Sequence, residues 1–182
     1  MDNMKKFARL GPIISVMGVL IAYLIHHDWW RITENAISDL GKVGLPYNWV
    51  MNASLIIGAL LLIIFSASMI VKREKLQWKA SFSLYLLGMI FLALVGIFPE
   101  GTSPHYEVSW GFFIFTFLAV LATSISLLLE GDKTGVLGII IFAIGVPLSL
   151  WALHRFEGVA VAETIGVIAF LIWHYTLLKK LK

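Results

Sequence analysis

The sequence predicts an all-α integral membrane protein, a bundle of six transmembrane helices. Of its 182 residues, 59% are hydrophobic and only 14% are charged, whereas a soluble domain is typically about half apolar and a quarter charged. The mean hydropathy is +0.89. The apolar residues also fall into six long runs, each close to the roughly 20 residues that a helix needs to cross the hydrocarbon core.

The six runs are expected to be helices and to form a single domain over residues 1–182 with short connections. Barrel strands would alternate apolar and polar residues, and these runs do not. Lipid also requires every backbone polar group to be bonded within the chain, which a helix achieves by itself. The predicted spans cover about 7–27, 48–71, 78–98, 107–129, 134–153 and 160–178.

The distribution of basic residues predicts the direction of insertion, because Lys and Arg concentrate in cytoplasmic connections. Of the 14 Lys and Arg, only Arg31, Lys42 and Arg155 fall in connections one, three and five. The other eleven fall at the termini and in connections two and four. We therefore expect a multi-pass protein of the cell membrane with both termini in the cytoplasm. Topology explains the basic clusters, so nucleic acid is not an expected partner.

Several kinds of chemistry are excluded or unsupported. The chain has no cysteine, which excludes a thiolate nucleophile and a Cys-ligated metal. It has no P-loop, no GxGxxG and no GxSxG motif, so nucleotide handling and a hydrolase elbow have no support.

The third predicted outer connection carries the most specific chemistry. Ser103 and Pro104 suit the N-cap and first position of the fourth helix. His105 and Ser109 are then one helical turn apart on one face, and Glu100 lies at the mouth of that helix. A carboxylate, an imidazole and a hydroxyl at this place could perform acid–base catalysis. Helix capping and interfacial hydrogen bonds would explain the same residues.

The first outer connection holds a second polar group, Asn35, Ser38 and Asp39, within about one helical turn. We expect a short interfacial helix from Asn35 to Leu40 that stops at the following glycine. Its side chains could present hydrogen-bonding groups to a site. A capped interfacial helix alone would use the same residue types.

The fifth connection provides His154 and Arg155, and Glu163 lies near the start of the sixth span. Ionisable groups at such positions usually face the bundle interior and serve a function. Arg155 could instead extend to the interface. His174, near the inner leaflet, is expected to be interfacial.

A metal is not predicted. Asp39, Glu100, His105 and His154 would suit zinc as a His/carboxylate set. No HExxH or HxxxH spacing occurs to demand one, so we predict no metal and no other cofactor.

Small residues on the fifth span suggest a surface through which two copies of the chain could associate. Gly131, Gly135 and Gly138 give this span a face that favours close helix packing. Such a face would allow a homodimer without requiring one.

Two motifs resemble a known family. They are Asn35-Ala-Ile-Ser38-Asp39-Leu-Gly41, and Gly96-Ile-Phe-Pro99-Glu100 followed by His105. Over essentially its whole length the chain resembles the prokaryotic six-span proteins of domain-of-unknown-function family 998. The Ile-Ser-Asp segment is more distantly similar to the eukaryotic membrane family of GPI-anchor remodelling factors and autophagy modulators. The resemblance implies six helices and a polar cluster made of Asn35, Ser38, Asp39, Glu100 and His105.

These observations favour a protein that processes a membrane lipid or its headgroup at the outer face, as a hydrolase or transferase. The distant relatives also point to lipid chemistry, by analogy alone. A transporter or channel for a small solute or proton, and a non-catalytic lipid-binding scaffold, are the alternatives. In the enzyme hypothesis, Asp39 and His105 form the acid–base pair, Glu100 is an orienting or second acid–base group, and Ser38 or Ser109 is the nucleophile. The substrate-binding residues are Asn35, Ser109, His154, Arg155 and Glu163, and Arg155 could hold a phosphate or carboxylate of the substrate.

Overall fold

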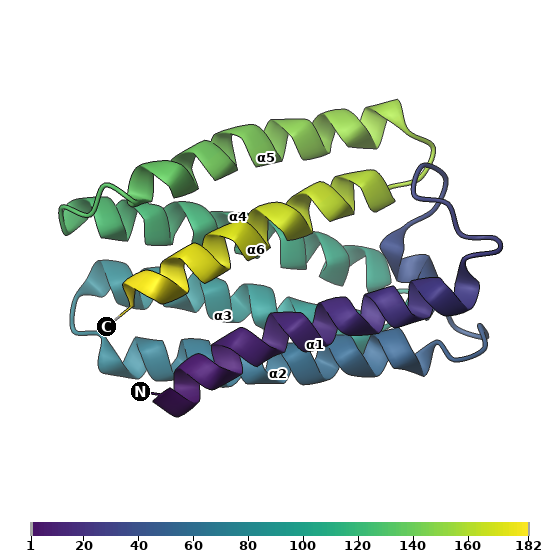
Figure 1. Ribbon diagram of the computed structural model, residues 1–182, viewed down its shortest axis with the longest axis horizontal. Coiled ribbons are helices and arrows are strands. Elements are labelled where there is room, and N and C mark those ends of the chain that lie inside the picture. The colour runs from purple at the N-terminus through teal and green to yellow at the C-terminus, as the bar shows by residue number, and fades with distance from the viewer. Residues whose placement is uncertain (1, 182) are drawn as a thin grey trace.

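The computed structural model describes residues 2–181, so Met1 and Lys182, at the two ends of the predicted domain, lie outside it. The described residues form six long helices and one short 3-10 helix, with no strand among them (Figure 1). All six long helices are long and apolar enough to cross a membrane, which confirms the all-α six-span prediction. The elements are α1 (Asp2–His26), η1 (Ile37–Gly41), α2 (Trp49–Lys72), α3 (Leu76–Ile97), α4 (His105–Leu129), α5 (Gly135–Arg155) and α6 (Ala160–Lys180).

Both ends of the described chain lie at the same end of the bundle, as six crossings require (Figure 1). We call this the terminal end; it also carries the α2–α3 and α4–α5 turns. The opposite end, here the loop end, carries the α1–α2 connection with η1, the α3–α4 connection and the α5–α6 connection. The three predicted polar segments therefore share one end of the molecule.

Large apolar side chains cover the outer surface of the bundle. Leu24 on α1 is 66% exposed and Ile144 on α5 is 59% exposed, and comparable side chains occur on every long helix. A soluble monomer rarely exposes apolar surface on this scale. The chain is an integral membrane protein.

Helices α1 and α2 approach closely because small residues line their contact. A Cβ added at Gly18 would overlap Ser54 Oγ, and one added at Gly58 would overlap Ser15 Oγ. Small residues let helix backbones approach in lipid, where dispersion contacts replace the hydrophobic effect as the main source of packing energy.

Two of the three glycines predicted to form a small-residue face on the fifth span pack inside the chain, whereas Gly131 lies in the turn before α5. Gly135 and Gly138 are buried in α5, and a Cβ at either would overlap atoms of Ser124 on α4. Helix α5 lies at one edge of the bundle and packs mainly against α4 and α6 (Figure 1). A homodimer would have to use another surface.

Aromatic side chains fill the half of the bundle toward the terminal end, and His174 belongs to this core. Its Nε2 donates to the Ala8 carbonyl oxygen at 2.8 Å, and its Nδ1 accepts from the Tyr85 hydroxyl at 2.9 Å. The side chain is 1% exposed. The expectation of an interfacial His174 was therefore wrong. Its partners lie on α1 and α3, far away in sequence, and they satisfy both ring nitrogens within the core.

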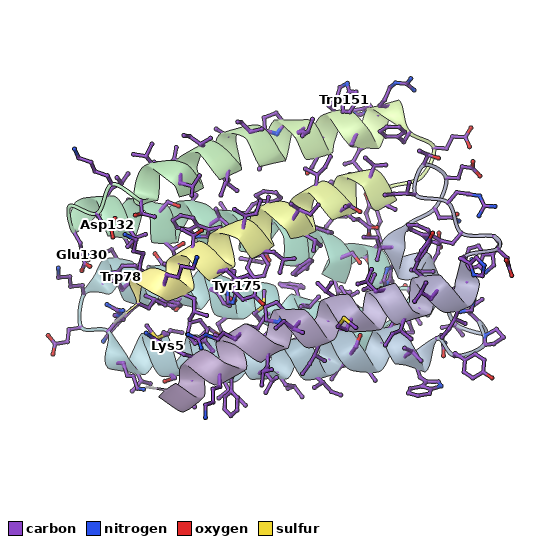
Figure 2. All side chains as sticks on the ribbon, viewed as in Figure 1. Lys5, Trp78, Glu130, Asp132, Trp151 and Tyr175 are labelled. Carbon is purple, nitrogen blue, oxygen red and sulfur yellow. The ribbon has the colours of Figure 1, made fainter. Side chains whose placement is uncertain are left out.

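Ion pairs connect the turns at the terminal end, where Figure 2 labels Glu130 and Asp132. Lys75 Nζ lies 2.9 Å from Glu130 Oε1, and Lys180 Nζ lies 3.2 Å from Asp132 Oδ2. Hydrogen bonds from Thr134, helped by Lys180, lower the pKa of Asp132 to about 2. These carboxylates are structural links, because each is already paired with a neighbouring turn or helix.

Candidate functional site

Backbone hydrogen bonds hold the three connections of the loop end together. They link the first connection to the other two, so the polar segments keep fixed positions relative to one another. The bonds run from Val43 N–H to Glu100 O, from Gly158 N–H to Thr33 O and from Ala160 N–H to Asn35 O, each at 2.9 Å.

Asn35 and Asp39 shape the backbone before η1. Asp39 Oδ2 accepts from the Ala36 N–H at 2.8 Å and from Asn35 Nδ2 at 3.3 Å. Asn35 Oδ1 accepts from the Arg31 N–H at 2.8 Å. Asp39 thus stabilises the start of η1, where backbone N–H groups lack helical partners. Its bonded carboxylate oxygen is directed at the backbone of its own segment.

Ser38 and Glu163 join η1 to the rest of the site. Glu163, in the first turn of α6, accepts from the Ile37 N–H through Oε2 at 2.6 Å. Ser38 is buried, and its Oγ lies 3.5 Å from Glu100 Oε2, at the outer limit of a hydrogen bond. The short helix therefore contacts both other connections through side chains.

A tight turn presents Glu100. The Thr102 N–H donates to the Pro99 carbonyl at 3.1 Å, which places Glu100 and Gly101 at the two central positions. Gly101 has φ of +93°, the left-handed conformation that the second central residue of a type II turn requires. Proline before Glu100 suits the end of α3, since it cannot continue a helix.

His105 is the centre of the polar cluster. Its Nδ1 lies 2.8 Å from the Phe98 carbonyl oxygen, which α3 leaves unbonded where it ends. Its Nε2 lies 3.2 Å from Glu100 Oε2 and 3.3 Å from Ser109 Oγ. The His105 side chain is buried, and the Glu100 side chain is 33% exposed.

The Phe98 carbonyl fixes which nitrogen of His105 is free for chemistry. A carbonyl oxygen only accepts, so Nδ1 carries a proton and the neutral ring has its lone pair on Nε2. In this state Nε2 accepts from the Ser109 hydroxyl. When Nε2 is protonated, it donates to the Glu100 carboxylate. One nitrogen therefore alternates between a hydroxyl and a carboxylate, which is the arrangement a general base needs.

The polar cluster closes one end of a cavity of about 640 Å³. Its polar end includes Ser38, Glu100, His105, Ser109 and Glu163. Its walls come mainly from α4 and α5, with part of α6, and they are largely apolar. A volume of this size lies within the range of about 300–1,000 Å³ that is typical of small-molecule sites.

The structure separates the predicted site residues into three groups. Ser38, Glu100, His105, Ser109 and Glu163 meet at the cavity. The Asn35 and Asp39 side chains lie next to this group, in the backbone network of η1. The third group, His154 and Arg155, is exposed and does not line the cavity.

The four residues considered for zinc do not converge. His154 lies away from the cavity, and Asp39 is engaged by η1. Among residues 2–181, no group of three His, Asp or Glu side chains is arranged to hold a metal ion.

A comparison with known protein families identifies the family of this chain. The sequence model of a family described as a protein of unknown function (DUF998) matches residues 9–179. The chain belongs to the DUF998 family. No curated protein and no solved structure matches the chain, so the resemblance to the eukaryotic remodelling family stays a prediction.

Some cavity residues of this DUF998 protein were not singled out from the sequence. Tyr106, Trp110, Phe113 and Phe117 line the cavity from α4, and Phe142 lines it from α5. The four on α4 recur at intervals of three and four residues, so they form one face with Ser109. This periodicity was visible in the sequence, but such a stripe is more often part of a packed core.

Glu163 is expected to anchor η1 in this DUF998 protein. Glu163→Ala leaves the Ile37 N–H without its acceptor, and a buried donor left unpaired costs about 1–3 kcal/mol. Thermal unfolding in detergent should show the loss, and hydrogen exchange should show faster exchange of the Ile37 amide. Glu157→Ala, at an exposed glutamate of the α5–α6 connection, serves as the control. An unchanged melting temperature with a protected Ile37 amide would contradict the anchoring role.

Proposed function

We propose that this protein binds a membrane lipid in the cavity and hydrolyses or transfers an acyl ester at its polar end. A single observation carries the proposal: an acid–base set, Glu100, His105 and Ser109, lies at one end of an otherwise apolar cavity within a transmembrane bundle. The cavity is amphipathic along its length, as a membrane lipid is.

The cavity walls support an acyl chain as the apolar part of the ligand. Below the polar cluster, Phe113 and Phe117 from α4 face the same space as Phe142, Val146 and Leu150 from α5. An α-helix rises 1.5 Å per residue, so eight residues from Ser109 to Phe117 span about 12 Å. An ester held at Ser109 would leave that length for its chain.

The proposed reaction uses His105 as general base. Nε2 takes the proton from Ser109 Oγ as the oxygen attacks the ester carbonyl carbon. The tetrahedral intermediate then collapses, the carbonyl carbon–alkoxide oxygen bond breaks, and the leaving oxygen takes the proton from Nε2. Water releases the acyl group from Ser109 by the same two proton transfers in hydrolysis, and a second alcohol does so in transfer.

Glu100 and Phe98 would assist His105 in different ways. The Glu100 carboxylate, 3.2 Å from Nε2, stabilises the imidazolium that forms during attack. The Phe98 carbonyl, 2.8 Å from Nδ1, holds the ring and its tautomer. This assignment replaces Asp39 with Glu100 as the carboxylate partner, because the bonded oxygen of Asp39 serves the backbone of η1.

In this proposal the loop end faces the outside of the cell membrane, with both termini in the cytoplasm. The support is the charge distribution, since eleven of the 14 Lys and Arg belong to the termini and the two connections at the terminal end. The site would then act on the outer leaflet.

Turnover by reconstituted protein tests the function. Purified protein in vesicles of mixed acyl lipids is expected to release fatty acid or to form a new acyl ester, detected by mass spectrometry. Ser109→Ala should abolish the product, whereas Ser103→Ala, at an exposed serine of the α3–α4 connection, should not. Intact lipids of every class with wild-type protein, or full turnover by Ser109→Ala, would overturn the proposal.

Lipid binding without turnover is the second candidate. One observation favours it: the polar side chains at the cavity end already bond one another or the backbone, so the cluster can serve to lock the bundle. Retained lipid with no product would support it. Solute transport has less support, because large side chains such as Trp78, Phe82 and Trp173 fill the core toward the terminal end.

A further inference from the structure

We infer that the lipid taken by this cavity carries an ammonium group in its headgroup, a protonated amine or a quaternary ammonium, rather than a headgroup whose only charge is negative. The inference rests on the proposed function and specifies the substrate class of the same site. It follows from the charges that line the polar end, from the positions of the nearby basic residues and from an aromatic pair on α4.

The polar end of the cavity is acidic. Two carboxylates, Glu100 and Glu163, line it, and no Lys or Arg side chain does so among the described residues. The His105 ring can carry a positive charge, but its Nε2 then faces Glu100. A headgroup whose only charge is negative would lose its hydration here without gaining a fixed cation, which is strongly unfavourable. An ammonium group would gain an opposite charge.

None of the three basic residues of the loop end lines the cavity. The Arg31 guanidinium donates to the carbonyl oxygens of His27, Asp28 and Trp30 at 3.0–3.1 Å. The Arg155 guanidinium lies over the Phe156 ring, with its central carbon 5.7 Å from the ring centroid. Lys42 is exposed and is not part of the cavity lining. Arg155, considered from the sequence as a phosphate ligand, is therefore not positioned for that role.

An aromatic pair lines the same cavity as Glu100. The Tyr106 and Trp110 rings have centroids 6.2 Å apart at an angle of 66°. Tyr106 is 69% exposed and Trp110 is 38% exposed, so their faces are accessible. Aromatic faces next to a carboxylate recognise ammonium groups through cation–π attraction, and tryptophan is the most effective residue. Neutral and anionic headgroups gain nothing comparable.

The order of residues along α4 fits a lipid with this headgroup. Tyr106 lies nearest the connection, Ser109 and Trp110 follow one turn deeper, and Phe113 and Phe117 lie farther into the bundle. An ammonium group at Tyr106 and Trp110 would place the ester near Ser109 and the acyl chain among the phenylalanines. All three parts of the ligand thus meet complementary side chains in sequence.

Lipids that differ only in headgroup test the inference. Protein in nanodiscs is offered phosphatidylethanolamine, phosphatidylcholine and phosphatidylglycerol with identical acyl chains, and bound lipid is counted by native mass spectrometry. Ala162→Phe places a large side chain in the cavity from α6, so any lipid that this variant still binds is bound elsewhere on the surface. We expect the cavity-specific binding of the two ammonium lipids to exceed that of phosphatidylglycerol about tenfold. Trp110→Leu should abolish this preference, and Trp151→Leu, at an exposed tryptophan outside the cavity lining, should leave it intact.

The outcomes separate the two proposals. Equal or stronger cavity-specific binding of phosphatidylglycerol overturns the headgroup inference, and Ser109-dependent turnover of that lipid would still uphold the proposed function. Preference for ammonium lipids without any turnover supports the headgroup inference and overturns the catalytic function. If Ala162→Phe removes no bound lipid of any class, the cavity is not a lipid site and both proposals fail.

Discussion

Replacing His105 with asparagine is expected to lower the rate of lipid turnover by about 100- to 10,000-fold while the bundle stays folded. The asparagine amide can occupy the position of Nδ1 and still donate to the Phe98 carbonyl. It provides no group that can take the proton from Ser109 Oγ. His105→Ala removes both functions and should lose turnover and some thermal stability. Turnover in vesicles and melting temperature in detergent, measured on the same preparations, distinguish the two losses.

A second histidine in the chain provides a matched control for His105. His27 Nε2 lies 3.2 Å from Asp28 Oδ1, the same separation as the His105–Glu100 pair, but both side chains are exposed and neither lines the cavity that contains His105. His27→Asn should therefore keep wild-type turnover. Equal turnover by His105→Asn and wild type would show that Nε2 is not the base. A similar loss in both variants would show that the effect is not specific to the cavity.

Gly58→Val is expected to reduce the free energy of unfolding by about 3 kcal/mol, the upper end of typical overpacking effects. A Cβ at this position would overlap Ser15 Oγ and would also lie too close to the Gly11 carbonyl oxygen. The serine side chain could rotate away, but the Gly11 carbonyl is part of the α1 backbone. The two helices must therefore separate, and the contacts along their interface weaken together. Thermal unfolding in detergent, followed by circular dichroism, measures the change.

The control for Gly58→Val adds methyl groups where lipid can accommodate them. Ala143→Val changes an exposed position on α5 and should alter the melting temperature little. A Gly58→Val protein that unfolds at the wild-type temperature would mean that the α1–α2 contact is looser than the structure indicates. A comparable loss in Ala143→Val would mean that β-branching in a helix causes the effect.

The transmembrane helices were predictable because lipid imposes a simple requirement on sequence. A spanning helix needs about 20 apolar residues, so each span appears as an uninterrupted run. Differences occur at the ends, where polar groups compete. The fourth helix begins at His105, after Pro104, whereas Ser103 was expected to cap it. Two successive turns precede the helix, with the Thr102 N–H bonded to the Pro99 carbonyl and the His105 N–H bonded to the Thr102 carbonyl. No simple sequence pattern indicates such turns.

The candidate site was predictable only where its residues are close in sequence. The spacing of His105 and Ser109 fixes a shared helical face, and the structure places them 3.3 Å apart. Sequence spacing could not show that Asp39 serves the backbone and not the cavity. Its bond to the Ala36 N–H is local, and a capping residue and a site residue in this segment would be of the same types. The contact of Glu163 with Ile37 spans 126 positions, and no local pattern encodes it.

The position of α5 at the edge of the bundle determines how a ligand would reach the cavity. This helix packs mainly against α4 and α6 and provides one wall of the cavity. A small outward displacement of α5 would open that wall sideways to the hydrocarbon phase. A lipid entering by this route would diffuse in two dimensions and never pass through water. The mole fraction of the lipid in its leaflet would then govern the occupancy of the cavity. Diluting that lipid with inert lipid should therefore weaken binding even when the bulk concentration of the bound lipid is constant.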